Sequence, residues 1–263
     1  MIPPIFEYIK LYVSFPTRSI KVVWLLNELK VPLWLPPHNN QTRPFTPTIQ
    51  AFFLKLERGD HMNKNLNPHP FLKVPSLVYK LHNEDKERVL FESGAMLLFL
   101  LEHFDKEKKL CNTENVANVG DRYKWLFWTS SSFEMESQIA IKYFKTLLAK
   151  KGLNLTTKDQ LVMTEQEKAD FDDKAKTVRQ SLLPYLESQI ASRDPSFKFI
   201  FGNSLDVADM AIGFCLKGID LCSVLNGEDY PKTFEYYNHL CATESYRTTL
   251  KQLFTLFTSP EYQ

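Results

Sequence analysis

The hydrophobic pattern changes about 100 residues into the chain, and this change limits the folds that the chain can adopt. Before Asp105, short apolar runs typical of strands alternate with helical stretches. After it, strand patterns nearly vanish and apolar residues recur at the spacing of one helix face. A chain of 263 residues can form two modest domains. We therefore expect a mixed α/β domain over residues 1–104 and an all-helical bundle over residues 112–263, joined by a polar linker.

The first part of the chain predicts the element order β-α-β followed by β-β-α. Strands are expected at Ile9–Val13, Ile49–Leu56, Ser76–Leu81 and Val89–Phe91. Helices are expected over Ser19–Leu29 and from Glu92 to His103. A right-handed crossover makes the first two strands parallel, and a hairpin adds the others antiparallel. The prediction is a mixed four-stranded sheet, with a long Pro- and Asn-rich insert at Leu35–Thr48.

The second part of the chain predicts helices only. Their expected positions are Asn115–Lys151, Thr164–Ala191, Val207–Leu216, Lys232–Ala242 and Tyr246–Phe257. Asp206 and Asp209 have the spacing of a capping box, in which the first acid caps the helix and the second bonds back to it. We interpret this pair as a structural helix start and assign it no chemistry.

Composition excludes several functional classes. The formal net charge is +1, which argues against a dedicated nucleic-acid binder. No apolar run approaches the roughly 20 residues that a membrane span needs, and the first residues lack the features of a signal peptide. The four cysteines show neither CxxC nor zinc-ligand spacing, so we expect no metal and free thiols in a cytoplasmic protein. None of these cysteines precedes Cys111.

Val74-Pro75 is the first of two local signals for ligand binding. An X-Pro bond is cis in only about 5 % of cases, and a proline at the first position of a strand is the ordinary alternative. If this bond is cis, the N–H and C=O of Val74 point outward. They could then pair with an extended peptide ligand as a neighbouring strand would.

Glu92-Ser93, at a predicted helix start, is the second signal. The ordinary alternative is that Ser93 caps the helix and Glu92 complements its positive end. In the functional interpretation, the free N–H groups and the Ser93 hydroxyl bind a carboxylate, and Glu92 pairs with an ammonium group. An amino-acid head group carries both charges. Together the two signals suit the γ-glutamyl end of a tripeptide such as glutathione.

Other polar residues could complete such a site. His61 and Lys73 are candidates for the glycyl carboxylate, although solvated surface positions are the alternative. Ser14 follows the first strand, where a hydroxyl can donate a hydrogen bond to a thiolate and so lower a thiol pKa from about 8.5. Thr17 and Ser19 could take that role instead, or these hydroxyls could serve only the turn and the helix cap.

Aromatic residues crowd one predicted helix of the second part, and most such side chains belong to a core. One or two could line an apolar pocket for a second substrate. Phe15, beside the candidate hydroxyl, and Trp128, on the aromatic helix, are the residues we expect there.

Four motifs resemble those of the glutathione transferase superfamily, over nearly the whole chain except the insert and the last residues. S-F-P-T-R resembles the S-x-P-x-R motif of theta and delta enzymes, and R-G-D-H-M-N resembles a theta and phi segment whose histidine contacts the glycyl carboxylate. L-N-P-H-P-F-L-K-V-P-S-L resembles the signature before the cis-proline, with Phe71-Leu72 replacing the usual glycine. F-E-S-G-A-M resembles the helix that follows, and Asp209 matches the capping box of the helical domain. The nearest similarity is to fungal theta- and phi-like enzymes.

The resemblance implies a thioredoxin-like domain followed by a helical one, and a homodimeric, cytoplasmic detoxification enzyme. It implies that Ser14 activates glutathione for conjugation to a hydrophobic electrophile, with peroxidase activity as a further possibility. His61, Lys73, Val74, Glu92 and Ser93 would bind the peptide. The alternative function is a non-catalytic ligandin or regulatory module on the same fold. A glutaredoxin-like thiol oxidoreductase is disfavoured, because no cysteine lies at the first helix start.

Overall fold

The computed structural model describes residues 5–34, 49–56, 58–110 and 116–259, which form two compact units. Unit 1 contains residues 1–113 and 242–263, and unit 2 contains residues 114–241. We describe each unit by itself. The predicted insert at Leu35–Thr48 and Cys111 lie outside the described residues.

Unit 1 is built on a mixed five-stranded sheet in the order β2-β3-β1-β4-β5. Its strands are β1 (Phe6–Val13), β2 (Leu33–Trp34), β3 (Ile49–Phe53), β4 (Ser76–Leu81) and β5 (Arg88–Leu90). As expected, β1 pairs parallel with β3 and antiparallel with β4, and β5 pairs antiparallel with β4. The prediction missed β2, which pairs parallel with β3. Its two residues are too few to show a periodic pattern.

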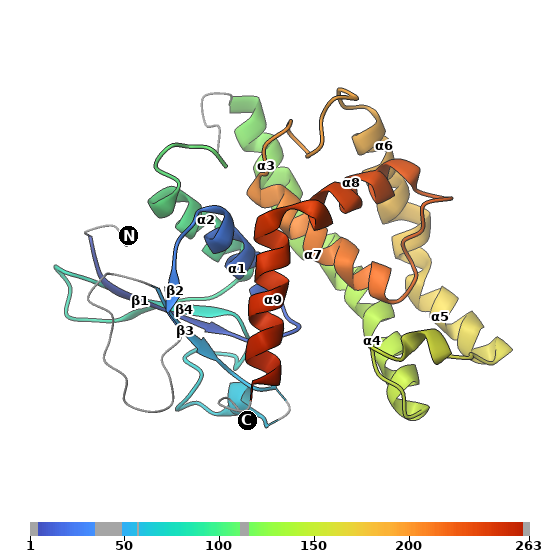
Figure 1. The fold of residues 1–263 in the computed structure, drawn as a ribbon, viewed down its shortest axis with the longest axis horizontal. Coiled ribbons are helices and arrows are strands. Elements are labelled where there is room, and N and C mark those ends of the chain that lie inside the picture. Colours follow the sequence, from blue (N-terminus) through green and yellow to red (C-terminus); the bar gives the residue numbers. More distant parts are fainter. Residues whose placement is uncertain (1–4, 35–48, 57, 111–115, 260–263) are drawn as a thin grey trace. The chain divides into compact units, whose positions relative to one another are not determined.

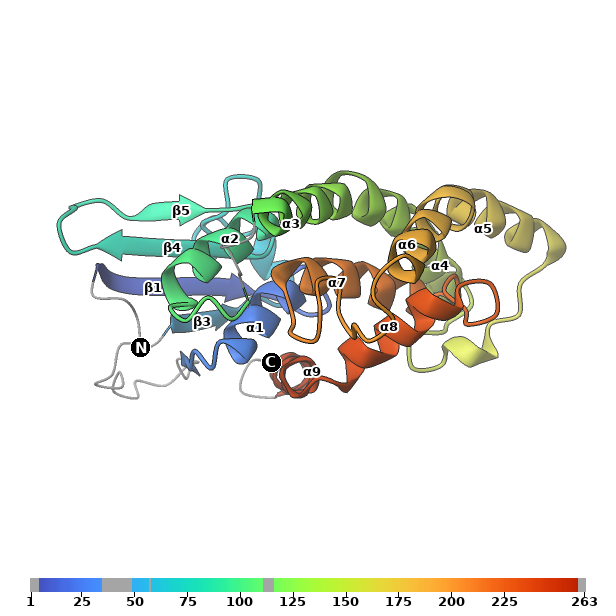
Figure 2. The same ribbon diagram turned by 90° about the horizontal axis from the view of Figure 1, so that it is seen from above.

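Helices α1 (Ser19–Glu28) and α2 (Ser93–Phe104) pack together against one face of the sheet (Figures 1 and 2). Alternate residues of β1, namely Ile9, Leu11 and Val13, are buried beneath them. In α1 all residues from Val22 to Leu26 are buried. The apolar surface of this helix is therefore larger than the area that one sheet face can cover.

The C-terminal helix α9 (Glu244–Thr258) covers the rest of that surface, because it packs along α1 (Figure 1). The Trp24 indole lies 4.7 Å from the Tyr246 ring, centroid to centroid. The Asn27 side-chain amide donates to the hydroxyl of Thr249 at 2.8 Å. Unit 1 therefore joins both ends of the chain. The division into domains of residues 1–104 and 112–263 stays a prediction.

Unit 2 is helical, as expected. Its longer helices are α3 (Val116–Trp128), α4 (Glu134–Lys150), α5 (Glu165–Thr177), α6 (Leu183–Ala191), α7 (Val207–Leu221) and α8 (Pro231–Ala242). π-helical turns at Thr129–Phe133 and Val178–Leu182 join α3 to α4 and α5 to α6, so each predicted long helix runs through a bulge. At the first bulge the Thr129 hydroxyl donates to the Trp125 carbonyl at 2.6 Å. Pro184 lies two residues beyond the second bulge and supplies no N–H to the helix.

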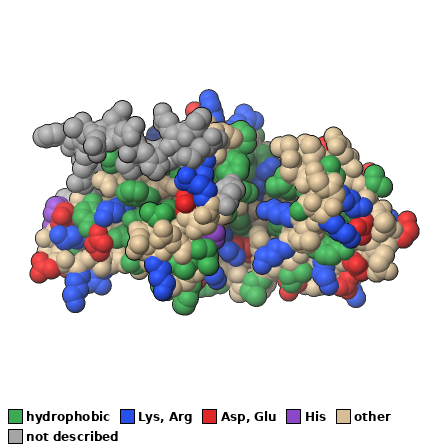
Figure 3. Space-filling model, turned by 90° about the horizontal axis from the view of Figure 1, so that it is seen from below, with side chains coloured by type: hydrophobic (Ala, Val, Ile, Leu, Met, Phe, Trp, Pro, Cys, Tyr) green, Lys and Arg blue, Asp and Glu red, His purple; other side chains and the backbone are tan. Residues whose placement is uncertain are grey.

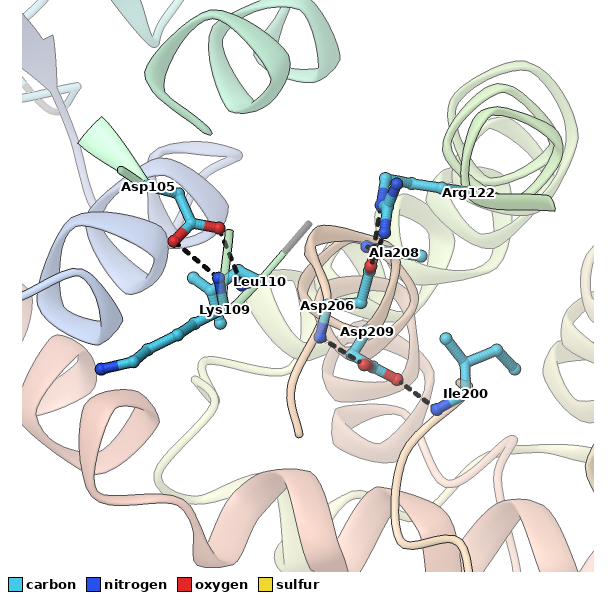
Figure 4. Close-up of polar contacts among 8 residues, drawn as sticks. All are labelled: Asp105, Lys109, Leu110, Arg122, Ile200, Asp206, Ala208 and Asp209. Atoms are coloured by element: carbon cyan, nitrogen blue, oxygen red, sulfur yellow. Dashed lines mark hydrogen bonds and ion pairs between the residues drawn. The ribbon is translucent and has the colours of Figure 1, made fainter. Parts of the chain in front are cut away.

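The predicted capping box is present at the start of α7 (Figure 4). One oxygen of Asp206 accepts from the Ala208 N–H at 2.9 Å, and the other binds the Arg122 side chain. Asp209 accepts from the Asp206 N–H at 2.7 Å and from the Ile200 N–H at 2.9 Å. The box thus holds the chain before α7 as well as capping it.

In unit 1, the buried Asp105 plays a comparable part at the end of α2. Its two carboxylate oxygens accept from the N–H groups of Lys109 and Leu110, at 2.9 and 2.7 Å (Figure 4).

Elsewhere, charged side chains of both signs are interspersed on the face seen in Figure 3. None of the described helices is long and apolar enough to cross a membrane. No disulfide joins the described cysteines Cys215, Cys222 and Cys241.

Candidate functional site

Strand register brings three predicted segments to one end of the sheet in unit 1. Tyr12 of β1 lies opposite Ser76 of β4, and Leu77 of β4 lies opposite Leu90 of β5. Continuing each register past the strand ends puts Ser14 opposite Val74 and Pro75 opposite Glu92. Neighbouring strands lie about 4.8 Å apart, so the three segments are within reach of one small ligand.

The Val74–Pro75 peptide bond is cis, the geometry that the functional interpretation requires. Strand β4 begins only at Ser76, one residue after the proline. No hydrogen bond between described residues uses the N–H or the C=O of Val74. This half-buried residue therefore offers one donor and one acceptor beside the sheet edge, as a strand does to a pairing peptide.

Glu92 adopts a conformation that is rare for a residue with a side chain. Its φ is 70° and its ψ is 111°, and it forms the N-cap position of α2. No side chain caps this helix, so the ordinary alternative of a Ser93 cap is not observed. The carbonyl of Glu92 accepts the N–H of Met96, which leaves the preceding N–H groups of the first turn to a ligand or to water. The exposed Glu92 carboxylate and the buried Ser93 lie at that helix end.

His61 and Lys73 lie on the loop between β3 and β4. His61 belongs to a short 3-10 turn (η1, Asp60–Met62), which Gly59 enters with a φ of 72° that suits glycine. Asp60 fixes the turn by accepting from the backbone N–H of Lys55 at 3.0 Å. His61 is half-buried and its Nδ1 has no hydrogen-bond partner among the described residues, whereas Lys73 is exposed.

Two further residues of this loop were not predicted for the site. Asn67 is buried and donates its side-chain amide to the backbone carbonyls of His61 and Lys73. The His69 ring is also buried, accepts the Phe71 N–H at 3.0 Å and lies 5.2 Å from the Phe91 ring. Burial lowers the pKa of His69 below its ordinary value of 6.5. The L-N-P motif contains Asn67, but a motif does not show which carbonyls an amide reaches.

The candidate hydroxyls of Ser14, Thr17 and Ser19 lie close together at the start of α1 and are partly or fully buried. The Ser14 side chain is only 1 % exposed, and its hydroxyl has no partner among the described residues. The Thr17 hydroxyl donates to the Ser14 carbonyl at 2.7 Å and lies 2.8 Å from the Ser19 hydroxyl. The Ser19 oxygen in turn accepts the Ser14 N–H at 3.0 Å. Ser14 therefore keeps an unused hydroxyl, but it must rotate before a ligand thiol can reach it.

The two residues predicted for a hydrophobic pocket belong to different units. Phe15, in unit 1, is half-buried against two rings of α9, at 6.4 Å from Phe254 and 6.1 Å from Phe257. Trp128, in unit 2, packs among aromatic residues, 5.0 Å from Phe133 and 5.5 Å from Tyr185.

A pocket of about 330 Å³ lies in unit 2, where the loop after α6 meets α8. None of the predicted site residues lines it, and an ion pair between Lys232 and Glu235 occupies part of its rim. The described residues contain no cluster of three or more His, Cys, Asp or Glu side chains that could hold a metal ion.

Solved structures resemble the chain over nearly all of its length. Glutathione transferase URE2P6 of Phanerochaete chrysosporium, in complex with oxidized glutathione, matches 94 % of this chain and 97 % of its own, at 17 % identity and a TM-score of 0.65. A glutathione transferase homolog of Lodderomyces elongisporus, with two glutathione molecules per subunit, matches 94 % and 99 %, at 14 % identity and a TM-score of 0.69. The chain has the glutathione transferase fold. No protein-family model and no curated protein matches the sequence.

A third structure with the glutathione transferase fold comes from cocrystals with a glutathione conjugate. Ure2p5 of Phanerochaete chrysosporium was cocrystallized with 1-(S-glutathionyl)-2,4-dinitrobenzene. It matches 96 % of this chain and 97 % of its own, at 17 % identity and a TM-score of 0.65. At these identities the likeness establishes the fold, and function has to be argued from the site.

Proposed function

We propose that this protein binds glutathione at the end of the unit 1 sheet and uses its thiol in transfer reactions. One observation carries the proposal. The Val74–Pro75 bond is cis, no hydrogen bond between the described residues uses the Val74 backbone, and the continued register puts the uncapped start of α2 one strand spacing away. The arrangement offers a strand edge and an anion site to one ligand, and a γ-glutamyl tripeptide has groups for both.

Each proposed contact follows from the chemistry of one group. The Val74 N–H and C=O pair with the cysteinyl residue of glutathione. The first turn of α2 and the Ser93 hydroxyl bind the γ-glutamyl carboxylate, and Glu92 pairs with the α-ammonium. His61 and Lys73 bind the glycyl carboxylate at the other end. The rare backbone conformation of Glu92 supports this assignment, because strained residues gather at binding sites.

The proposed chemistry is nucleophilic attack by the bound thiolate on a hydrophobic electrophile. With a chlorinated dinitrobenzene, a carbon–sulfur bond forms and chloride leaves with the bonding electron pair, while the thiol proton goes to solvent. After rotating outward, Ser14 stabilises the thiolate by donating its hydroxyl proton in a hydrogen bond. The conjugate with which Ure2p5 was cocrystallized supports aromatic electrophiles as the substrate class. Phe15 would flank such a ring in unit 1, and a part for Trp128 stays a prediction.

A second function is favoured by the state of the hydroxyls. Ser14 is buried and the Thr17 hydroxyl donates to the Ser14 carbonyl, so neither hydroxyl proton is open to a thiol. A protein that binds glutathione without activating it would have this arrangement. The second candidate is therefore a non-catalytic ligandin or regulatory module.

Calorimetry with glutathione, together with conjugation of 1-chloro-2,4-dinitrobenzene, tests the two candidates. Binding with turnover supports the transferase. Binding without turnover, and without reduction of an organic hydroperoxide, supports the module. Absence of glutathione binding contradicts both.

We further propose that the protein acts in the cytoplasm as a homodimer, on the fungal theta- and phi-like branch of the fold. Support for a partner comes from exposed apolar side chains on α3 and α4. Phe127, Met135 and Ile139 are 67 %, 61 % and 45 % exposed. Light scattering after size-exclusion chromatography measures the mass of the particle, and a monomer at micromolar concentration contradicts the dimer.

A further inference from the structure

The side chain of Asn67 uses both ends of its amide. Its Nδ2 donates to the carbonyl of His61 at 2.8 Å and to the carbonyl of Lys73 at 3.0 Å. Its Oδ1 accepts from the N–H of His69 at 3.0 Å and from the hydroxyl of Ser76 at 3.4 Å. The residue is 2 % exposed, so water does not compete for these groups. Both amide protons of Asn67 are therefore committed to holding backbone.

The hydrogen bonds of Asn67 span the loop between η1 and β4, whereas the other hydrogen bonds of this loop join groups that are close in the chain. Asn67 reaches six residues back to His61 and six residues forward to Lys73. Among the described residues, the remaining bonds between Asn63 and Leu72 join groups two to four positions apart. No helix or strand of the structure runs from η1, which ends at Met62, to β4, which begins at Ser76. The distance between the His61 and Lys73 backbones is thus set by one buried amide.

The cis bond joins Val74 and Pro75, the two residues directly after Lys73, and Ser76 follows them. Asn67 bonds to residues on both sides of that bond. The amide therefore ties the segment that would hold the middle of a peptide ligand to the segment that would hold its far end.

We infer that Asn67 is a positioning residue that makes the site selective for glutathione over γ-glutamylcysteine. This inference rests on the proposed function. Asn67 touches no ligand itself. It fixes His61 and Lys73 where they meet the glycyl carboxylate, which γ-glutamylcysteine lacks, while the γ-glutamyl end is held by α2.

Asn67→Asp tests the inference with little change of shape. The substitution replaces two N–H donors by an oxygen that repels the two carbonyls, and it keeps the acceptor for His69. Asn63→Asp is the matched control. Asn63 is exposed on the same loop and uses its side chain as an acceptor for the Asn65 N–H, which aspartate also accepts. The control places the same charge on the same loop without breaking a bond.

The dissociation constants of glutathione and γ-glutamylcysteine are measured by calorimetry on the parent protein and both variants. We expect Asn67→Asp to weaken glutathione about tenfold and γ-glutamylcysteine by less than about twofold, since one buried hydrogen bond has roughly that worth. Asn63→Asp should leave the ratio of the two constants unchanged.

Equal weakening of both ligands by Asn67→Asp, or no weakening of either, overturns the inference while leaving glutathione binding by the parent protein intact. Failure of the parent protein to bind glutathione overturns the proposed function as well. If Asn67→Asp does not fold, Asn67→Ser, which keeps one donor, is measured in its place. An unchanged selectivity in that variant overturns the inference equally.

Discussion

The indole Nε1 of Trp24 donates a 3.0 Å hydrogen bond to the hydroxyl of Ser245, which lies 221 residues later in the chain. Both side chains are buried, and Trp24 is fully enclosed. The bond therefore makes α9 part of the core of unit 1. Because the proposed site is built on the same sheet and on α1, the last helix supports the geometry of the first loop.

Ser245→Ala should lower the free energy of unfolding by about 1–3 kcal/mol, because it leaves the buried indole N–H without an acceptor. Urea denaturation measures the change. Thr248→Ala on the exposed side of the same helix is the control and should stay within about 0.5 kcal/mol of the parent protein. Equal stability of the two variants would show that the bond does not secure α9.

Ser14→Ala should reduce conjugation at saturating glutathione by about 100-fold and change the dissociation constant of glutathione by less than about threefold. The reason is that the hydroxyl stabilises the thiolate, whereas other groups hold the peptide. Calorimetry and steady-state kinetics on the same preparation separate the two effects. If turnover survives in this variant, thiol activation belongs to Thr17 or to a backbone N–H.

Glu92→Gly should stabilise the protein by about 1 kcal/mol while weakening glutathione binding. Glycine accepts a φ of 70° without the cost that a side chain incurs, and the contact to the ligand ammonium is lost. Glu92→Gln is the comparison, since it loses the charge and keeps the backbone cost. Thermal unfolding should show that the glycine variant is more stable than the glutamine variant. Calorimetry should show weaker glutathione binding in both variants. If the glycine variant is no more stable than the glutamine variant, the backbone conformation of Glu92 carries no strain.

Stability should fall on acidification below about pH 6.5 partly because His69 is buried. A lowered pKa means that the unfolded chain binds the proton more readily than the folded one. The contribution of His69 to stability is therefore complete when the pH is above the ordinary histidine pKa. It decreases as the pH falls toward the lowered pKa of the folded state. Glu92 opposes this shift and Lys73 adds to it. His69→Asn, which can still accept the Phe71 N–H, should flatten the decrease measured by urea denaturation between about pH 7 and pH 5. An unchanged slope would exclude His69 as its source.

Asp209→Asn should destabilise unit 2 by about 2 kcal/mol or more. Both carboxylate oxygens accept hydrogen bonds, including one of 2.6 Å from the Tyr236 hydroxyl, so an amide nitrogen at either position faces a donor. Burial raises the pKa of Asp209 to about 7, and the stability associated with this group is lost as pH rises toward that value. Asp194→Asn, where aspartate accepts only from Ser196, is the control. Chemical denaturation monitored by tryptophan fluorescence measures both, and equal stability would contradict the role of the box.

Local signals in the sequence predicted local structure well. The Asp206–Asp209 box and the long helices were predictable, because a cap and a periodicity are contained within a few turns. The four longer strands and their pairing followed from the turn between them and the handedness of the crossover.

Features that depend on distant residues were not predictable. The periodicity of α9 shows that one face is apolar, but does not show that the partner is α1 rather than a helix of unit 2. The loop sequence suggested Ser14 as a hydroxyl donor, whereas its burial depends on the packing around it. The role of Asn67 depends on which carbonyls the folded loop brings to it.

During translation, α1 is made long before α9, the helix against which it packs. At roughly 5–20 residues per second, Trp24 leaves the ribosome roughly 10–45 s before Ser245. The residues of unit 2, 114–241, are translated during that interval, and the last of them precedes Ser245 by only four positions. The apolar side of α1 has no α9 to cover it until that helix is made, so this part of the N-terminal unit stays incomplete long after its own residues have been translated.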